Sequence, residues 1–451
     1  MVGDDAPTRS LTPLVKLKYE SSAMSNRRFI LVLACFLGLI AGQRFTLPFA
    51  SSVICLAMIA WSLSVQRNYA LSLSLAVLSV FFSVDMGVVD GNQTPTLVRY
   101  VSYAYLIIHL VTLHQLSLTR VLIGGIFFMY LLLQSLLALQ EADLSQLWRD
   151  VQTLFLMGLY LCAVPKATRS FDYSIITYSI CGYLVSDLYN FVFLKDAWYG
   201  DYLNYSSTKF LVIWPSLYFL FKRSFAAWII TTLATILVLA GYGGRTLFLS
   251  YLLLTIGLAL LTPGFLLVFS ICLTTVFSLG LFFASDLSVT LESLKTLNAL
   301  LIIFETGWSA FYLLDPVRYY ESKLFFEQPL ADLFFGNGLG AGLYDKANLL
   351  GFVGVKDTAF SATELSSQKY YGFHDVWVDW GVRFGLIPTC TFIGLLVLKV
   401  IRSRSSTRFL TAIGLVGCVA AFYGVAPLIL TAAILLISLQ SRTALPHAED
   451  Y

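Results

Sequence analysis

The sequence predicts an all-α protein, a polytopic transmembrane helix bundle of about 12 to 14 spans with one long extracytoplasmic loop that contains short helices. The first observation is composition: of 451 residues, 58% are hydrophobic and 12% are charged, against roughly 25% charged in soluble domains. The second is a series of apolar runs from Phe29 almost to the C-terminus, which approach the ~20 residues that a membrane-crossing helix needs. The third is one connection, within 286–372, that is far longer than the others.

These runs divide the chain into successive parts. We expect a cytoplasmic N-terminal tail at 1–28, a transmembrane bundle at 29–285, a large outer loop at 286–375, C-terminal transmembrane spans at 376–440 and a cytoplasmic tail at 441–451. Individual spans are expected at 29–43, 45–64, 69–90, 97–116, 120–140, 151–164, 172–194, 208–221, 225–241, 245–262, 265–285, 376–400, 408–424 and 426–440. The polar tail, with no cleavage site after the first span, predicts an uncleaved anchor.

Basic residues predict how the spans are oriented. Alternate short loops carry basic clusters, namely Arg67, Arg120, Lys166 with Arg169, Lys222 with Arg223, and Arg402 with Arg404 and Arg408. The opposite loops differ, because 90–96 has no basic residue and 141–150 is rich in acids. By the positive-inside rule, both termini are expected in the cytoplasm and the long loop outside.

The long loop contains signals for a short helix and a turn. Asp315 is suited to an N-cap and Pro316 to the first helical position, and apolar residues then recur at helical spacing until Pro329. We expect this helix to lie at the membrane surface. The glycine-rich stretch 336–342 follows no strand of a βαβ unit, so it predicts a flexible turn rather than a nucleotide site.

Arg245 and Arg318 are candidates for binding an anion. Arg245 follows a glycine cluster and begins a span, where backbone N–H groups already favour an anion, although an arginine at a span end is commonly an interfacial anchor. Arg318 lies in the first turn of the expected loop helix, where its charge opposes the helix dipole. It either pairs with Glu321 or clamps a pyrophosphate through its planar fork.

His374 lies where the long loop re-enters the membrane, and it is either a general base or a helix-capping residue beside Asp375. Asp375, Asp379 and Arg383 follow at steps of one helical turn, which predicts an ion-pair ladder that orients the histidine. The outer loops contain no D-x-D pair or His/Cys cluster, so we expect metal-independent chemistry and no cofactor. The net charge of +3 is too small to indicate a nucleic-acid partner, and none is expected.

Three segments resemble the superfamily of O-antigen polymerases of the Wzy type and O-antigen ligases, which are membrane glycosyltransferases of GT-C-like architecture. Gly243 to Phe248 is similar to the family's arginine motif, and 318–342 to its loop pattern of arginine, helix, proline and Gly-x-Gly-x-Gly turn. His374, with Gly385 beyond it, is similar to the family's histidine motif. Asp375 stands where Asn, Ser or Gln is more usual, and Pro388 where Gly, Thr or Tyr is expected.

The resemblance implies a polysaccharide polymerase of the bacterial inner membrane whose active site faces the periplasm. A glycan on undecaprenyl pyrophosphate would pass to a sugar hydroxyl of a lipid-linked acceptor. Arg245 and Arg318 would stabilise the leaving pyrophosphate, and His374 would take the acceptor proton or orient the acceptor. The expected partners are this lipid-linked oligosaccharide, membrane lipids and, where chain length is controlled, a regulator protein.

The resemblance and the residue chemistry together suggest supporting roles for further residues. Substrate contacts are expected from Asp375, and from Tyr319, Tyr320 and Trp377 with Trp380, whose rings can stack on sugars or anchor the chain at the membrane interface. Structural support is expected from Asp379, Arg383, Gly338 and Gly340.

Two other functions are compatible with the sequence. An O-antigen ligase or a protein oligosaccharyltransferase would use the same donor with another acceptor. A flippase or transporter of lipid-linked glycans would also have many spans. Such a protein should be built from two similar halves. No segment in the N-terminal half resembles the region from Arg245 to His374.

Overall fold

The structure is a computed structural model of the full chain. It describes residues 13–43, 48–84, 93–116, 118–137, 143–144, 147–148, 150–151, 163–165, 172–193, 212–241, 251, 316–354, 360, 362–371, 373, 375–391 and 394. All structural statements below concern these residues.

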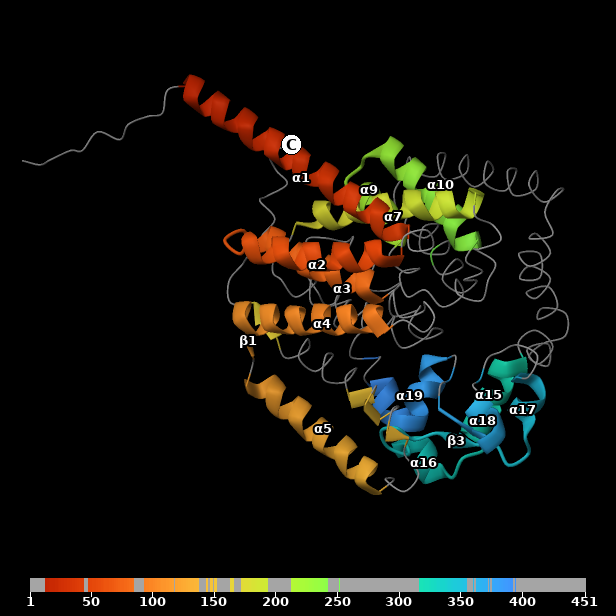
Figure 1. The fold of residues 1–451 in the computed structure, drawn as a ribbon. Coiled ribbons are helices and arrows are strands. Elements are labelled where there is room, and N and C mark those ends of the chain that lie inside the picture. The colour runs from red at the N-terminus through yellow and green to blue at the C-terminus, as the bar shows by residue number, and fades with distance from the viewer. Residues whose placement is uncertain are drawn as a thin grey trace, which may run out of the picture.

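The described chain is mostly helical (Figure 1). Its first half contains α1 (Pro13–Gly42), α2 (Pro48–Ser64), α3 (Tyr69–Val84), α4 (Gln93–Leu113), α5 (Leu118–Leu137), α7 (Tyr173–Phe193), α9 (Trp214–Phe221) and α10 (Phe225–Gly241). The later part contains α15 (Pro316–Phe326), α16 (Leu330–Phe335), α17 (Leu349–Gly354), α18 (Ala362–Ser367) and α19 (Val376–Phe384). Two short antiparallel sheets pair β1 (His114–Leu116) with β2 (Ala163–Pro165), and β3 (Leu343–Tyr344) with β4 (Lys369–Tyr370).

Helices α1 and α7 cross at very short range because small residues face each other. A Cβ atom on Gly38 would overlap the carbonyl oxygen of Ser179, and one on Gly182 would overlap that of Cys35. Gly42 likewise lies against Ser186. Glycine therefore allows the two backbones to touch, and the Gly38-x-x-x-Gly42 spacing is typical of helix packing in membranes.

Several hydroxyl groups inside the bundle form hydrogen bonds within one helix or in a short chain between helices. Ser79 and Ser83 donate to carbonyl oxygens one turn earlier in α3, each over 2.7 to 2.8 Å. A longer chain joins three helices: Tyr105 of α4 donates to Ser62 of α2, Ser62 bonds to Ser72 of α3, and Ser72 bonds to Nε2 of His109 over 2.7 Å. Such bonds let serine and histidine occupy an apolar bundle without a desolvation penalty.

The observed helices agree with several expected spans and correct others. The bounds of α10 are those expected, and α7 agrees within one residue at each end. Helix α1 begins at Pro13, inside the expected polar tail, and residues 163–165 at the end of an expected span form a strand. The span expected at 376–400 is interrupted, because Gly385 has a φ of +84° and ends α19.

No helix in the part of the chain that the structure describes is both long enough and apolar enough to be identified as a membrane span. The spans expected at 265–285, 408–424 and 426–440 lie outside the described residues.

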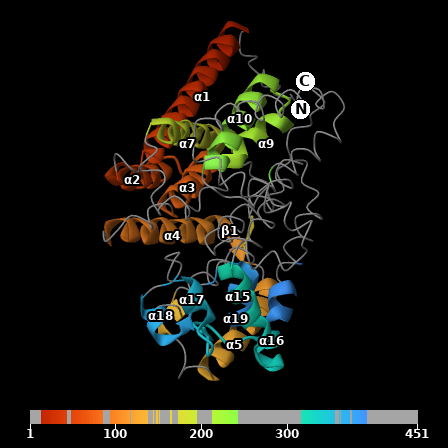
Figure 2. The ribbon, with the colours of Figure 1, turned by 90° about the vertical axis from the view of Figure 1, so that its right-hand side faces the viewer.

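Helices α15 to α19 and the β3–β4 sheet form a separate helical module, residues 316–391, which lies beside the bundle in both views (Figures 1 and 2). Its own core contains Val317, Phe325, Leu333, Leu343, Leu350, Phe360, Tyr370, Phe373, Val378 and Val382. Two of its buried aromatic residues, Trp380 and Phe384, belong instead to the core shared with the bundle. Helix α5 contacts the module through Tyr130, whose hydroxyl donates to the carbonyl oxygen of Phe335 over 3.2 Å.

Candidate functional site

Arg318 and Asp375 form an ion pair between the starts of two helices. Helix α15 begins at Pro316, as the sequence predicts, and Arg318 lies in its first turn. Asp375 is the N-cap of α19, and its carbonyl oxygen accepts the first helical hydrogen bonds. The Nε atom of Arg318 lies 3.7 Å from Oδ1 of Asp375. The pair therefore joins two motif positions that are distant in the sequence.

The environment of this pair is asymmetric. The side chain of Arg318 is 31% exposed, whereas that of Asp375 is 6% exposed. A guanidinium that reaches the surface beside two helix N-termini can bind an anion from outside the protein. Glu321, the alternative partner suggested by sequence, is fully buried in the module. Arg318 forms an ion pair with Asp375 at the module surface.

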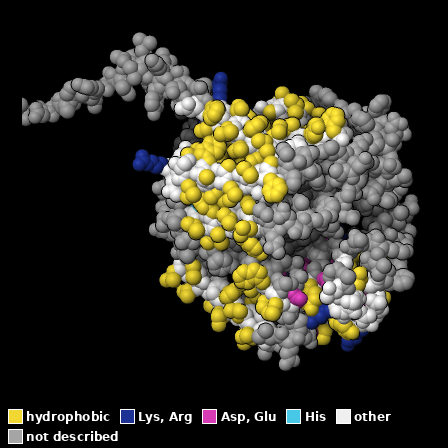
Figure 3. All heavy atoms as spheres, in the orientation of Figure 1, with side chains coloured by type: hydrophobic (Ala, Val, Ile, Leu, Met, Phe, Trp, Pro, Cys, Tyr) yellow, Lys and Arg dark blue, Asp and Glu magenta, His cyan; other side chains and the backbone are white. Residues whose placement is uncertain are grey.

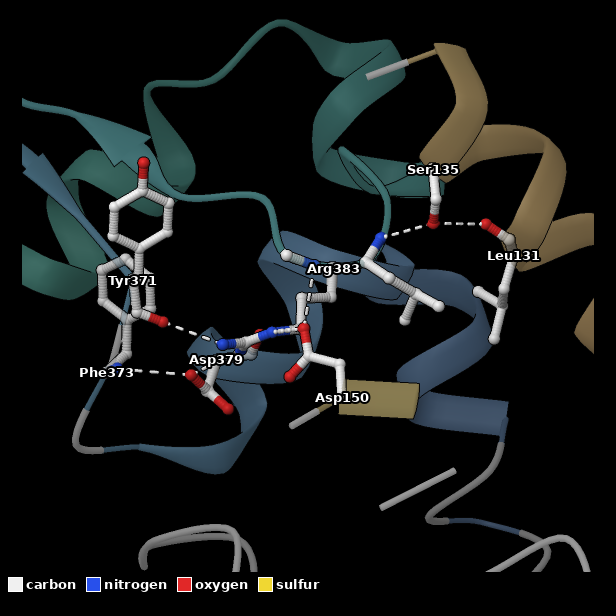
Figure 4. A network of polar contacts seen from close by, with 9 residues as sticks. Leu131, Ser135, Asp150, Tyr371, Phe373, Asp379 and Arg383 are labelled. Carbon is white, nitrogen blue, oxygen red and sulfur yellow. Dashed lines mark hydrogen bonds and ion pairs between the residues drawn. The ribbon is translucent and has the colours of Figure 1, made fainter. Parts of the chain in front are cut away.

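A second, fully buried charge cluster is centred on Arg383 (Figure 4). Its guanidinium contacts Asp379 one turn earlier in α19 and Asp150 from the first half of the chain, each at 2.5 Å. It also donates to the carbonyl oxygen of Tyr371 over 2.8 Å. Asp379 accepts a further hydrogen bond from the backbone N–H of Phe373. Of the expected ladder, the Asp379–Arg383 pair is present, while Asp375 pairs with Arg318.

The sequence predicted a flexible glycine-rich turn. In the structure, hydrogen bonds join the turn to α19, α5 and Asp150. Gly336, Gly338 and Gly340 have φ values of +82°, +91° and +72°, which favour glycine. The N–H of Gly338 donates to the carbonyl oxygen of Arg383, and that of Gly340 donates to Oδ2 of Asp150 over 2.9 Å. Between them, the N–H of Leu339 donates to Ser135 of α5 over 2.9 Å. Their N–H groups therefore join the turn to α19 and to Asp150.

The aromatic candidates occupy different environments. Tyr319 and Tyr320 are half-buried on α15 and their rings meet edge to face. Trp377 packs against the rings of Phe325 and Phe326, so part of its surface is used inside the module. Trp380 is buried against Phe384, which leaves its ring inaccessible to a sugar in this structure.

Arg245 and His374 lie outside the described residues, as does Asp315. The residues on both sides of His374 are nevertheless described. Phe373 is bonded to Asp379 through its N–H, and Asp375 is paired with Arg318. Both residues next to His374 in the chain therefore have partners, Phe373 in α19 and Asp375 in α15.

Asp150 is the site residue that sequence reasoning missed. It lies at the end of the acid-rich loop 141–150, just before an apolar run, and is buried. Burying a carboxylate at such a boundary costs free energy unless the carboxylate is paired. The position of Asp150 beside an apolar run is therefore the local sign that it has a partner. Its partners, Gly340 and Arg383, cannot be deduced from spacing.

Within the described residues, no group of three or more His, Cys, Asp or Glu side chains is placed to hold a metal ion. A comparison of the chain with protein-family models, with curated proteins and with solved structures finds no match.

Proposed function

We propose that this chain is a membrane-embedded glycosyltransferase that lengthens a polysaccharide from polyprenyl-pyrophosphate-linked units at the outer face of a bacterial inner membrane. The observation that carries the proposal is the Arg318–Asp375 pair. It brings the loop arginine beside the residue that follows His374, at a distance of 3.7 Å. These are the two parts of the loop that resemble the polymerase and ligase superfamily.

The apolar surface of the helices supports a membrane location. Large hydrophobic side chains are exposed over the bundle and over α5 (Figure 3). They include Phe29, Val32 and Phe36 on α1, Phe49 and Val53 on α2, Ile108 on α4, Leu122, Ile126, Met129 and Leu133 on α5, and Ile230 on α10. Soluble monomers rarely expose contiguous apolar surface of this kind, whereas lipid would cover it. The close Gly38–Gly182 crossing also supports a membrane location, because small residues are enriched where helices pack in membranes.

Basic residues at one end of the bundle support the proposed orientation. Arg27 of α1 lies near Tyr218 of α9, whose hydroxyl is 3.3 Å from Ser174 at the start of α7. Lys222 and Arg223 follow directly after the end of α9, four and five residues beyond Tyr218. The opposite ends of α1 and α7 meet through polar side chains, with Gln43 bonded to Ser186 and Asn190 to the carbonyl oxygen of Gly42. The basic end would face the cytoplasm.

In the proposed reaction, an acceptor hydroxyl attacks the anomeric carbon of the donor sugar. The new glycosidic bond forms as the bond to pyrophosphate breaks, and the pyrophosphate leaves with the electron pair. Arg318 would stabilise the charge that grows on this leaving group, with Arg245 in the same role from the other motif. His374 would accept the hydroxyl proton. Asp375 would orient the Arg318 fork and limit its mobility.

The decisive experiment supplies purified protein with lipid-linked repeat units alone, in the presence of a chelator, and measures product length on a gel. The wild type should make longer lipid-linked chains. Arg318→Ala should reduce the rate by about 10² to 10³, the usual effect of removing one charge-stabilising donor. Arg318→Lys should rescue only weakly, because lysine lacks the planar fork. Lys323→Ala is the matched control, since Lys323 is an exposed cation on the same helix.

Other outcomes would identify another function. Chain extension only after addition of a lipid A core or a protein acceptor would indicate a ligase or an oligosaccharyltransferase. Movement of labelled donor across vesicles without any new bond would indicate a flippase. Full activity of Arg318→Ala would remove the assigned role of Arg318.

A further inference from the structure

We infer that Asp150 is a positioning residue, which holds the glycine-rich turn directly and holds Tyr371 and Phe373, which precede His374 in the chain, through the buried guanidinium of Arg383. The effect of Asp150 on catalysis rests on the proposed function. The contacts of Asp150 are independent of that proposal. The participants are Asp150 and Ser135 from the first half of the chain and the module residues around Arg383.

Asp150 acts in two directions. Its Oδ2 atom accepts the N–H of Gly340 over 2.9 Å, and the same atom receives Nε of Arg383. One carboxylate oxygen thus holds the turn and orients the guanidinium (Figure 4). Because Asp150 is buried, these charge-assisted bonds are not weakened by competing water.

Arg383 transmits this constraint to the strand before α19. With Nε directed at Asp150, its Nη1 atom contacts the carbonyl oxygen and Oδ1 of Asp379, and its Nη2 atom donates to the carbonyl oxygen of Tyr371. Asp379 in turn accepts the N–H of Phe373. The planar guanidinium allows these directions to be satisfied together only in one orientation. Tyr371 and Phe373, which precede His374 in the chain, are therefore positioned from Asp150.

Backbone hydrogen bonds also join the glycine turn to the part of α19 that carries Arg383. The N–H groups of Asn337 and Gly338 donate to the carbonyl oxygens of Val382 and Arg383, over 2.7 and 3.0 Å. Gly336 packs against Gly385 so closely that a Cβ on either would overlap the backbone of the other segment. A substitution at Asp150 should therefore loosen both the glycine turn and the residues before α19, although the two are not adjacent in the sequence.

Amide hydrogen exchange tests the inference without reference to activity. Asp150→Asn keeps the shape and removes the charge, so exchange in peptides covering 338–343 and 369–375 should become about 10- to 100-fold faster, the effect of losing a hydrogen bond to a charged group. Glu327→Gln is the control, because Glu327 pairs with Lys323 at the module surface. It should leave both peptides unchanged. Unchanged exchange in Asp150→Asn would overturn the positioning role.

A milder variant covers the case in which Asp150→Asn does not fold. Ser135→Ala removes the hydrogen bond from the N–H of Leu339 and the bond that Ser135 donates to the carbonyl oxygen of Leu131 within α5, and it leaves Asp150 and Arg383 in contact. It should accelerate exchange in 338–343 and leave 369–375 as in the wild type. Equal acceleration in both peptides would mean that the segments respond to general loosening rather than to Asp150 and Arg383.

The kinetic consequence is read from the extension assay. In Asp150→Asn, kcat should fall at least about 10-fold while KM for the donor changes less than about twofold, because the anion-binding Arg318 belongs to a different ion pair. Asp150→Glu should recover part of kcat. Faster exchange with unchanged kcat would overturn the link to catalysis. An inactive wild type would instead refute the proposed function and leave the exchange result intact.

Discussion

The guanidinium of Arg383 and the carboxylate of Asp150 lie 2.5 Å apart, although 233 positions separate the two residues in the chain. Both are buried, and together with Asp379 they connect the first half of the protein to the helical module. A buried charge can remain only where opposite charges and hydrogen bonds compensate for its lost hydration. The cluster is therefore the point at which the module is most sensitive to substitution.

Arg383→Met should lower the free energy of unfolding by about 3 to 5 kcal/mol, because it leaves two carboxylates buried without their cation. Denaturant titration in detergent micelles, followed by tryptophan fluorescence, measures this change. Lys323→Met, which breaks only a surface pair with Glu327, should cost about 0 to 1 kcal/mol. Equal effects of the two substitutions would show that burial does not govern the contribution of Arg383.

Gly336→Ala should destabilise the module by at least about 1 to 3 kcal/mol, because Gly336 has a φ of +82° and an added Cβ would meet the backbone at Gly385. Gly125→Ala is the control within a helix, since nothing lies within 4 Å of a Cβ at that position of α5. It should be stabilising by about 0.5 to 1 kcal/mol. The same titrations compare them, and a tolerated alanine at 336 would contradict the close contact.

Tyr370→Phe should increase stability, most clearly at alkaline pH. Tyr370 is fully buried and its hydroxyl has no hydrogen-bond partner among the described residues. Burial, and then the Asp345 and Glu364 carboxylates, raise the pKa of Tyr370. A pKa raised by folding leaves stability intact below the unfolded value of ~10 and removes it as pH rises through the folded pKa.

Phenylalanine cannot ionise, so the loss of stability above pH ~10 should be smaller in Tyr370→Phe than in the wild type. At neutral pH the variant should gain about 1 to 3 kcal/mol, the usual cost of burying an unbonded hydroxyl. Tyr344→Phe is the control, because Tyr344 is exposed on the neighbouring strand. A destabilised Tyr370→Phe at neutral pH would indicate that the hydroxyl has a favourable role.

The helices were predictable where apolar runs end at charged or turn residues. Helix α10 follows Lys222, Arg223 and Ser224 directly and has the expected bounds. The interruption of α19 at Gly385 was not predicted, because the positive φ of that glycine depends on its contact with the glycine turn. Strand β2 was missed for the same reason, since it depends on pairing with the distant β1.

The candidate site was predictable only within local segments. The helix start at Pro316 and the Asp379–Arg383 pair follow from spacing along one helix. The partners of Arg318 and Arg383 come from other segments, and sequence spacing carries no information about them. The Gly-x-x-x-Gly spacing at Gly38 is a local sign of close helix packing. The glycine turn was expected to be flexible because its hydrogen-bond acceptors, Ser135 and Asp150, lie far away in the sequence.

The proposed orientation predicts which turns a membrane-impermeant reagent can reach. In a chain whose seven cysteines are replaced by serine, Lys346→Cys in the module should react with an impermeant maleimide in cells with a permeabilised outer membrane. Gln66→Cys, between α2 and α3, should react only after the inner membrane is lysed. Both positions are exposed in the structure, so exposure does not distinguish them. Labelling of Gln66→Cys before lysis would contradict the orientation.

The final prediction concerns Arg318 and Asp375 as a unit. In the proposed site the carboxylate of Asp375, 3.7 Å from the guanidinium, both orients Arg318 and repels an approaching pyrophosphate. Asp375→Asn should therefore lower KM for the donor several-fold, about as expected for ~1 kcal/mol of relieved repulsion, while kcat falls because the arginine is less well held. Arg318→Ala should raise KM and lower kcat together.

The double variant Arg318→Ala, Asp375→Asn distinguishes a shared role from two separate ones. Residues that act on one leaving group through one ion pair should be non-additive, so the double variant should be no slower than Arg318→Ala, and the fall in KM caused by Asp375→Asn should disappear. The steady-state rates are measured over a range of donor concentrations at low and at physiological salt. Multiplicative losses in kcat would mean that the 3.7 Å pair has no part in binding the donor, and Asp375 would then act through its position beside His374 alone.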